Sequence, residues 1–195
     1  MPPTRLRSVP VTVAAVVLAA GGGTRFEGPG HKLLAEFRGR PLVWWALAAA
    51  AAARLDEVAV IVGAVDLGAA VPEGVRVIEN PDWASGQASS LQTVVSWAIE
   101  RQHEAVVVGL GDQPLVPSAA WAAVAASESP IAVATFGGQR RPPVRLARSV
   151  WSLLPTVGDE GARVLMKGRP DLVCEVACEG QPADIDNEED LSRWS

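Results

Sequence analysis

A glycine-rich segment followed by two cationic residues is the first candidate for chemistry in this chain. Gly21, Gly22 and Gly23 follow a valine-rich run, and Arg25 and Lys32 come shortly after them. Backbone amides without bulky side chains can bind phosphate oxygens, and the two cations add positive charge. A surface turn without a ligand is the alternative, but glycine runs rarely bring two cations to the end of a buried strand. The segment therefore predicts phosphate binding.

The spacing excludes two common phosphate-binding motifs. A P-loop requires lysine and then serine or threonine directly after its second glycine, whereas Gly28 is followed by Pro29. A dinucleotide-binding fingerprint has a third glycine where this chain has Phe26. Gly28, Pro29 and Gly30 also oppose a helix at this point, so the predicted phosphate site is a loop of another kind.

Two aspartates form a second candidate for chemistry. Asp112 follows the apolar run 104–110, and Asp186 also follows a predicted strand end. Two carboxylates together with phosphates are a usual way to hold magnesium, so Asp112 and Asp186 predict a Mg²⁺ site. A turn or helix cap is the alternative for each, and for Asp186 it is equally compatible because Asp184 and Asn187 stand beside it.

A third candidate lies where residues 80–91 lead from a strand into a helix. Ser89 or Ser90 would lie at the start of this helix, where exposed amides favour an anion or a polar base edge. A serine that only caps the helix is an equally good interpretation. His31 and His103 have no neighbours in the sequence that would make a catalytic pair, and the chain has no G-x-S-x-G or H-E-x-x-H motif. Hydrolases of those kinds are therefore not supported.

The elements that must position these residues follow an α/β pattern. Valine-rich runs alternate with alanine-rich helical stretches, which predicts a three-layer fold with a mostly parallel, Rossmann-like sheet and helices on both faces. In such a sheet ligands bind beyond the carboxyl ends of the strands, where the candidate residues stand. The predicted strands cover residues 11–19, 57–63, 75–79, 104–110, 130–136 and 171–178. The predicted helices cover residues 41–55 and 88–102, with short pieces near 149–154 and 159–167 and a last helix from Asn187.

Two details of this pattern can be checked in a structure. The helix over 88–102 should bury one face made by Leu91, Val94, Val95, Ala98 and Ile99. After residue 136 we expect a polar turn over 137–141 and a proline pair, in a segment that builds one wall of a site.

Length and composition indicate one folded domain over residues 1–195, with a loose tail over the first eight. Hydrophobic residues make up 49% of the chain and charged residues 20%. Seventeen basic and 22 acidic residues give a net charge of −5 without a basic stripe, which disfavours nucleic acid as a partner.

The chain is expected to be cytoplasmic and without a membrane segment. The apolar run 9–20 imitates a signal peptide, but Pro10 and Thr12 interrupt it, no cleavage site of A-x-A type follows, and it is too short to span a bilayer. Cys174 and Cys178 would lie roughly 13 Å apart on a strand, too far for a disulfide. They are expected to be core thiols in a reducing compartment.

Four motifs in this order resemble the MobA-like nucleotidyltransferases, and among them most closely the molybdenum-cofactor cytidylyltransferases. The resemblance covers residues 13–194. The motifs are Leu18-Ala19-Ala20-Gly21-x-Gly23-x-Arg25 with Lys32, Asn80-Pro81-x-Trp83-x-x-Gly86 with Ser89-Ser90-Leu91, Gly111-Asp112-x-Pro114-Leu115, and Asp184-Ile185-Asp186 with Glu189-Asp190-Leu191.

The resemblance implies a reaction in which a phosphate of molybdopterin attacks the α-phosphorus of CTP and releases pyrophosphate. It implies that Arg25, Lys32 and Asp112 are catalytic, with the two cations holding pyrophosphate, and that Asp112 and Asp186 hold Mg²⁺. The implied partners are CTP, a molybdopterin-type cofactor, and a molybdoenzyme or its maturation chaperone. The implied nucleotide-binding residues are Leu18, Ala19, Ala20, Gly21, Gly23, Arg25, Lys32 and Ser90.

The chain departs from the family pattern in three places. Arg25 and Lys32 are one residue further apart than is usual. The sequence Arg141-Pro142-Pro143-Val144 stands where relatives carry Gly-His-Pro-Val, so the histidine that faces the second substrate is replaced by Pro142. Asn187 replaces a common threonine.

Ala20 bears on the choice of nucleotide. Guanylyl relatives tend to carry glycine at this position and cytidylyl relatives alanine, so the resemblance implies a preference for CTP over GTP. Two other functions stay open, namely a nucleotidyltransferase acting on a sugar or alcohol phosphate and a non-catalytic chaperone that binds the nucleotide or cofactor. The pair of carboxylates favours catalysis over the chaperone.

Overall fold

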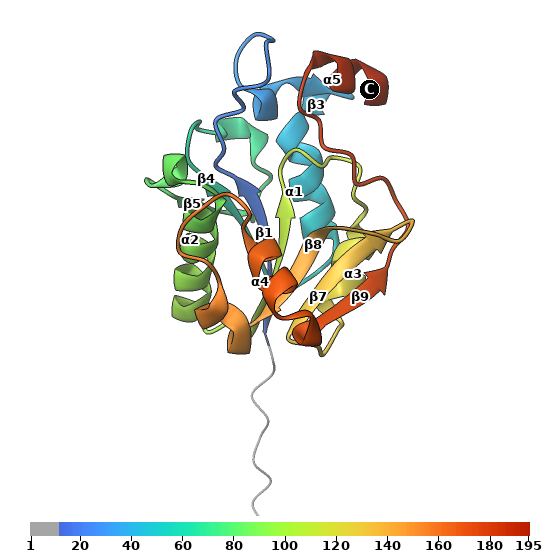
Figure 1. Ribbon diagram of the computed structural model, residues 1–195. Helices are drawn as coiled ribbons and strands as arrows, with labels where there is room; N and C mark the ends of the chain where they lie inside the picture. The colour runs from blue at the N-terminus through green and yellow to red at the C-terminus, as the bar shows by residue number, and fades with distance from the viewer. Residues whose placement is uncertain (1–11) are drawn as a thin grey trace, which may run out of the picture.

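A seven-stranded sheet forms the centre of the computed structural model, which describes residues 12–195 (Figure 1). The predicted N-terminal tail and Val11 lie outside the described residues. The strand order is β5-β4-β1-β6-β8-β7-β9, and all strands are parallel except β8, which is antiparallel to both of its neighbours. The strands are β1 (Val13–Ala19), β4 (Glu57–Val62), β5 (Arg76–Glu79), β6 (Ala105–Leu110), β7 (Ile131–Phe136), β8 (Gln139–Ala147) and β9 (Val173–Ala177).

Helices cover both faces of this sheet, which confirms the predicted three-layer α/β fold. Residues of α1 (Leu42–Ala52) and α3 (Ser118–Ala125) pack in the hydrophobic cluster on one face, and those of α2 (Gln87–Glu100) and α4 (Ala162–Gly168) in the cluster on the other. The last helix, α5 (Glu188–Trp194), packs beside the small hairpin of β2 (Glu36–Phe37) and β3 (Arg40–Pro41). No helix within residues 12–195 is long and apolar enough to cross a membrane.

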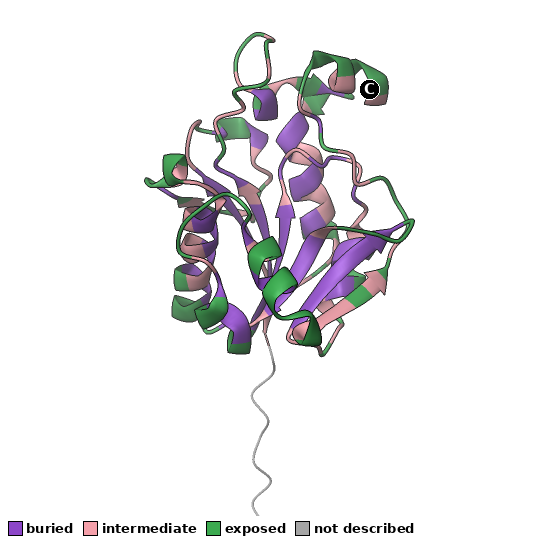
Figure 2. Ribbon diagram, in the orientation of Figure 1, coloured by how far each residue is buried: buried purple, intermediate pink, exposed green. Residues whose placement is uncertain are grey.

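The valine-rich strands are explained by burial on both faces. In β1, Ala14 and Val16 belong to one hydrophobic cluster and Ala15 and Val17 to the other, and all four are fully buried. Such strands have continuous apolar sequences because neither face of the sheet is exposed to water. Figure 2 shows the buried strands between the partly exposed helices.

The chain order creates a crevice beyond the carboxyl end of β1. From β1 the chain passes to β4 and β5 on one side, and later to β6 on the other side. Helices that follow β1 and β5 therefore lie on opposite faces, which opens a ligand-binding crevice at this switch point. The glycine-rich segment follows β1, and Asp112 follows β6.

Helix α2 lies where it was predicted, but one of the residues predicted to be buried is exposed. Leu91, Val94 and Ala98 are buried as expected, but Ile99 is 48% exposed and Trp97 is buried instead. The centroids of the Trp97 and His103 rings are 5.2 Å apart. The indole of Trp97 thus fills the place on the buried face that was predicted for Ile99.

The polar turn predicted over 137–141 is shorter in the structure. Only Gly137 and Gly138 form the turn, with φ angles of +57° and +79°, and the antiparallel strand β8 begins at Gln139. The prolines are tolerated within this strand because the register with β7 shifts across Pro142 and Pro143, which leaves both without a partner on β7.

Smaller features agree with the prediction only in part. Helix α3 was not predicted, because its alanine-rich sequence carries no start signal beyond Pro117. The 3₁₀ helix Arg148–Leu153 confirms the piece near 149–154. Cys174 and Cys178 are free, as expected, but both are half-buried and are not core thiols.

Glu57 joins three elements at the opposite end of the sheet. Its carboxylate accepts hydrogen bonds from Arg76 Nε at 2.9 Å and Arg101 Nε at 3.0 Å, and His103 Nε2 lies 3.2 Å away. Burial alone would raise the pKa of Glu57, but the hydrogen bonds from the two arginines outweigh it and lower the pKa below its ordinary value of 4.5.

We expect Glu57→Gln to destabilise the fold by about 2 kcal/mol at pH 7, since it weakens hydrogen bonds from two half-exposed arginines that contribute about 1 kcal/mol each. A lowered pKa in the folded state contributes stability that is present above pH 4.5 and is lost as the pH falls through the folded value. The difference in the free energy of unfolding between the two proteins, measured by urea titration, should therefore shrink between pH 7 and pH 3. A difference that is independent of pH would contradict this role.

Candidate functional site

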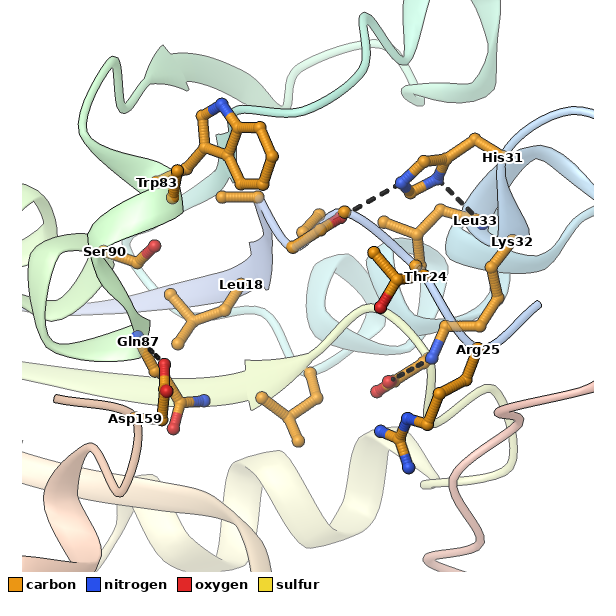
Figure 3. Close-up of a pocket in the computed structure, with 18 of the residues that line it drawn as sticks. Leu18, Thr24, Arg25, His31, Lys32, Leu33, Trp83, Gln87, Ser90 and Asp159 are labelled. Carbon is orange, nitrogen blue, oxygen red and sulfur yellow. Dashed lines mark hydrogen bonds and ion pairs between the residues drawn. The ribbon is translucent and has the colours of Figure 1, made fainter.

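A cavity of about 390 Å³ opens at the carboxyl edge of the sheet, beside the loop that follows β1. Every residue assigned to the site from the sequence lines it. Figure 3 labels Leu18, Arg25, Lys32 and Ser90 among them. These residues are Leu18, Ala19, Ala20, Gly21, Gly23, Arg25, Lys32, Ser90, Asp112 and Asp186. Lys32 and Asp186, which are 154 residues apart in the sequence, thus meet at one site.

Lys32 lies between the two aspartates. Its Nζ donates to Asp112 Oδ2 and to Asp186 Oδ1, each at 2.9 Å, and Arg25 Nη1 lies 2.9 Å from Asp186 Oδ2. The Lys32 side chain is 9% exposed, whereas that of Arg25 is 77% exposed. With the additional residue before it, the amine of Lys32 still reaches both aspartates, and Arg25 forms the outer edge of the site.

The charge of Lys32 is stabilised by its partners. Burial lowers the pKa of Lys32, but the charges and hydrogen-bonding oxygens of Asp112 and Asp186 more than offset this, and the net effect raises the pKa above its ordinary value of 10.5. Lys32 is thus a permanent cation, suited to binding phosphate rather than to accepting a proton.

Two backbone hydrogen bonds position the carboxylates. Gly111 N donates to Leu18 O at 2.9 Å, which fixes the end of β6 against the end of β1. Ile185 N donates to Asp112 O, also at 2.9 Å, which brings the C-terminal segment and Asp186 to the same place. The two aspartates are therefore held by backbone contacts that do not depend on their charge.

Neither aspartate serves as a helix cap. The cap of α5 is Asn187, whose side chain accepts a hydrogen bond from Asp190 N at 2.8 Å. Asp184 is held separately, since its carboxylate accepts a 2.8 Å hydrogen bond from Gln113 Nε2. Asp186 directs both of its carboxylate oxygens at cations in the cavity, and the structural role that its sequence left open is excluded.

The carboxylates can complete a metal site only with other ligands. Within residues 12–195 no group of three or more histidine, cysteine, aspartate or glutamate side chains could hold a metal ion. Asp112 Oδ1, however, is buried without a hydrogen-bond partner in the described chain. An oxygen in this state suits a hard cation whose remaining ligands are phosphate oxygens and water. The residues therefore fit a divalent ion that arrives with a phosphate compound.

Ser90 lies at the other end of the cavity. It stands within the first turn of α2, after the cap residue Gly86, and is 5% exposed. Its Oγ accepts a hydrogen bond from Asn80 Nδ2 at 3.0 Å, which leaves its own hydroxyl proton free to donate. Ser89 instead donates to Gly86 O at 2.8 Å. Ser90 is thus more than a helix cap and can contact a ligand.

The start of α2 is covered by a loop that the sequence did not predict. Ala88 N donates to Gly158 O at 2.9 Å, and Gln87 N donates to Asp159 Oδ1 at 3.3 Å. These contacts occupy the first amides of the helix, so the anion site predicted there is not open. Gln87 and Asp159 line the cavity, and nothing in their local sequence indicated it.

Trp83 and His31 also line the cavity and were not assigned a role from the sequence. A side chain at Gly63 would lie only 2.6 Å from Trp83, so this glycine makes room for the indole to pack across the crevice. His31 Nδ1 accepts a hydrogen bond from Leu33 N at 3.2 Å, which assigns the ring proton to Nε2, 3.0 Å from Gly21 O. Trp83 shapes one end of the cavity, and His31 supports the glycine loop.

This fold and this site define the class of protein. Matches to known proteins place this fold among the nucleotidyltransferases. Residues 15–173 match the family model described as the MobA-like NTP transferase domain, and the chain belongs to that family.

Similar proteins cover nearly the whole chain. The nicotine blue oxidoreductase of Paenarthrobacter nicotinovorans is 30% identical over 93% of this chain and 95% of its own length. The crystal structure of Rv0371c from Mycobacterium tuberculosis H37Rv has a TM-score of 0.79 at 26% identity, over 94% and 97% of the two chains.

Two further structures share the fold. A second structure of Rv0371c, in complex with manganese, has a TM-score of 0.67 at 23% identity, over 94% and 98% of the chains. A nucleotidyl transferase from Methanothermobacter thermautotroptrophicus has a TM-score of 0.77 at 22% identity, over 93% and 95%.

Proposed function

We propose that this protein transfers CMP from CTP to the phosphate of a molybdopterin-type cofactor and releases pyrophosphate. One observation carries the nucleotide part of the proposal. The cavity has a charged end, where the cations Lys32 and Arg25 lie with two carboxylates that a divalent ion would neutralise, and a less charged end with Trp83 and Ser90 (Figure 3). A nucleoside triphosphate has the same polarity, with an anionic tail and a flat polar base.

The nucleotide is therefore placed with its base near Ser90 and its phosphates near Lys32. The Ser90 hydroxyl donates to an acceptor on the base edge, and the Trp83 ring provides a face for apolar contact. Between them, the backbone of residues 19–23 passes along the middle of the nucleotide. The short glycine side chains let it approach closely.

The reaction needs alignment and neutralisation of charge more than covalent help. An oxygen of the acceptor phosphate forms a bond to the α-phosphorus of CTP, and the bond from that phosphorus to the bridging oxygen of pyrophosphate breaks. The leaving pyrophosphate takes the electron pair and its negative charge. Lys32 and Arg25 neutralise that charge as it develops.

A divalent cation is the proposed cofactor, with Mg²⁺ as the physiological ion. Asp112 and Asp186 would hold it, in agreement with the orphan oxygen of Asp112. The manganese complex of the related Rv0371c supports a divalent ion in this family. When bound, such an ion would add charge neutralisation at the phosphates.

The acceptor part of the proposal rests on the resemblance to the cytidylyltransferases and on Ala20. A molybdoenzyme or its maturation chaperone would then receive the product. The test is pyrophosphate release by the purified protein with Mg²⁺, each of the four nucleoside triphosphates, and molybdopterin or a sugar or alcohol phosphate. The proposal predicts release with CTP and molybdopterin. Pyrophosphate release only with a sugar or alcohol phosphate would show that this compound, and not molybdopterin, is the acceptor. Binding of CTP without pyrophosphate release would favour a chaperone.

The oxidoreductase among the relatives supports a second candidate, an oxidoreductase that acts on nicotine blue. That relative matches nearly the full chain at 30% identity. The glycine loop opposes this candidate, because the first helical residues after it form only the 3₁₀ turn Lys32–Leu34, whereas a dinucleotide fold starts a helix directly at its glycines. Oxidation of NADH or NADPH by nicotine blue, with no requirement for CTP, would establish it.

Ala20 is expected to set the preference for CTP. It lines the cavity and is 4% exposed, so its methyl group reduces the space for a purine. Overpacking of this kind costs about 1–3 kcal/mol, so we expect a ratio of kcat/KM for CTP over GTP of roughly ten to one hundred.

Ala20→Gly should bring that ratio towards one. Ala19→Gly is the comparison, because it adds the same backbone freedom. The backbone of Ala19 also lines the cavity, but its methyl packs in the hydrophobic cluster on the opposite face of the sheet. Equal changes in the two variants would show that loop flexibility, and not the methyl of Ala20, determines the choice.

A further inference from the structure

A loop over residues 155–161 brings a carboxylate to one end of the cavity of about 390 Å³ (the first cavity). Asp159 lines this cavity at the end where Ser90 and Trp83 lie, away from Lys32 (Figure 3). It takes no part in the ion pairs at the reacting end. The Asp159 carboxylate is therefore placed to contact the base of a bound nucleotide and not its phosphates.

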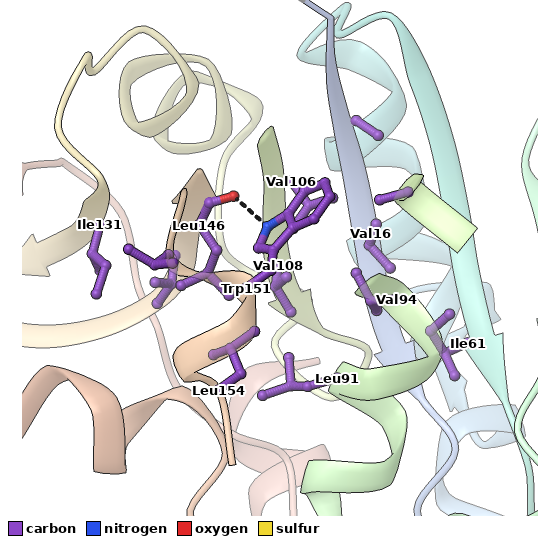
Figure 4. Packing of buried hydrophobic residues seen from close by; sticks show 14 of the residues in the cluster. Val16, Ile61, Leu91, Val94, Val106, Val108, Ile131, Leu146, Trp151 and Leu154 are labelled. Carbon is purple, nitrogen blue, oxygen red and sulfur yellow. Dashed lines mark hydrogen bonds between the residues drawn. The ribbon is translucent and has the colours of Figure 1, made fainter. Parts of the chain in front are cut away.

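Both ends of this loop are anchored in the core. Leu154, directly before the loop, packs in the same hydrophobic cluster as Leu91 of α2, and Figure 4 shows both side chains within this cluster. After the loop, Leu165 and Met166 of α4 are buried in the cluster as well. The loop thus starts and ends at fixed points.

Hydrogen bonds from α2 also hold the loop between its ends. Gln92 Nε2 donates to Pro155 O at 3.0 Å, and Ala88 N donates to Gly158 O at 2.9 Å. The second of these bonds comes directly before Asp159 in the chain. The position of the carboxylate is therefore determined by the first turns of α2.

Two glycines provide the space for this contact. A side chain at Gly86 would lie 2.6 Å from Asp159 Oδ1, and one at Gly161 would lie 2.5 Å from Gln87 Oε1. Their φ angles are +112° and +53°, in the region that favours glycine. Both glycines thus allow the loop to lie close to the start of α2.

The protein uses only one oxygen of the Asp159 carboxylate. Oδ1 accepts a hydrogen bond from Gln87 N at 3.3 Å, whereas Oδ2 accepts none from residues 12–195. No lysine or arginine of that range forms an ion pair with Asp159. Since a carboxylate only accepts hydrogen bonds, Oδ2 is an acceptor for a donor on a ligand.

Ser90 supplies a donor at a suitable offset from this acceptor. Gln87, to which Asp159 is bonded, and Ser90 are three residues, or about 4.5 Å, apart along the axis of α2. One pyrimidine ring can then place its 2-oxo group at the Ser90 hydroxyl and its position 4 at Asp159. Cytosine carries an amino donor at position 4, whereas uracil carries a carbonyl acceptor.

We propose that Asp159 accepts a hydrogen bond from the 4-amino group of cytosine and thereby discriminates CTP from UTP. The proposal rests on the proposed use of CTP and adds a selection that Ala20 does not provide, because the two pyrimidines have the same size. Bound uracil would direct its O4 at the carboxylate and leave two acceptors without a donor. Ala20 acting against purines and Asp159 acting against uracil would together select cytosine.

The test measures binding of the nucleotide without turnover. Calorimetry in the presence of Mg²⁺ compares the α,β-methylene analogues of CTP and UTP, which cannot release pyrophosphate. The wild-type protein should bind the CTP analogue about tenfold more tightly. This is the lower range for a hydrogen bond to a charged group, because Asp159 is exposed.

Asp159→Asn should lower the ratio of the two affinities to one or below. An asparagine keeps a carbonyl oxygen for Gln87 N but presents an NH₂ donor in place of Oδ2, which suits the O4 of uracil. Ser90→Ala should instead weaken both analogues about equally, because the 2-oxo group is common to the two bases.

Glu160→Gln is the matched control. It removes the same charge from the next residue of the loop, which lines a second cavity and not the first. Glu160→Gln should keep the full ratio of affinities.

Equal affinities of the wild type for the two analogues, or an unchanged ratio in Asp159→Asn, would overturn the proposal. Absence of binding of either analogue would overturn both the proposal and the proposed function. Failure of CMP transfer to every acceptor, with the Asp159-dependent ratio intact, would reject only the transfer reaction and leave the recognition of the base standing.

Discussion

Asp112→Asn is expected to lower kcat/KM for CTP by about a thousandfold while leaving the fold intact, the upper range for loss of one charged group that stabilises the transition state. Asp112 Oδ2 accepts from Lys32, and its buried Oδ1 has no partner in the described chain, so an amide would place hydrogen-bond donors where a cation is expected. The Mg²⁺ concentration that gives half-maximal rate should rise about tenfold or more.

Asp66→Asn is the matched control for this result. Asp66 is exposed, lines none of the cavities and accepts a 2.9 Å hydrogen bond from Gly68 N, which an asparagine can keep through its carbonyl oxygen. We expect a change in kcat/KM of less than about threefold, since surface substitutions away from such a site have small effects. Equal losses in the two variants would mean that a general change in charge, and not ligation by Asp112, governs the rate.

The second large effect is expected for Lys32→Met. The methionine keeps much of the volume of the side chain but removes the charge that lies 2.9 Å from both carboxylates. Loss of one preorganised cation at the phosphates should lower kcat by about a hundredfold to a thousandfold. The affinity for CTP, measured by calorimetry, should fall less than kcat, because the charge on pyrophosphate grows only as the bond breaks.

Lys167→Met provides the comparison for the nucleotide side. Lys167 is the other lysine of the chain, its side chain is 73% exposed, and it does not line the first cavity. Its substitution should leave CTP affinity unchanged. A Lys32→Met enzyme that loses affinity but keeps its kcat would show that Lys32 only binds the ground state.

The reacting part of the site could be predicted from the sequence because it depends on strand ends. Residues that follow parallel strands meet at one sheet edge, so the loop after β1 and Asp112 after β6 are expected to lie together. The strand end predicted before Asp186 is wrong, because residues 178–186 form no strand, and Asp186 reaches the site through the hydrogen bond from Ile185 N to Asp112 O. The role of Asp186 was ambiguous because the sequence alone does not show that Asn187, and not Asp186, is the N-cap of α5.

The residues that the sequence did not reveal reach the site through tertiary packing. Trp83 depends on the space left by Gly63, and Asp159 arrives with a loop that covers the start of α2. Strand β8 was missed because prolines argue against a strand unless a shift in register leaves them unpaired. None of these conditions has a local signal, since each depends on a partner distant in the chain.

The most direct test of the central claim follows the α-phosphorus of the nucleotide. The wild-type protein is incubated with Mg²⁺, molybdopterin and CTP labelled with ³²P at the α-position, and the labelled products and pyrophosphate are quantified together. The account predicts that label moves into a molybdopterin product with one pyrophosphate released per label transferred. Label that stays in CTP, or that appears only as free CMP, would contradict it.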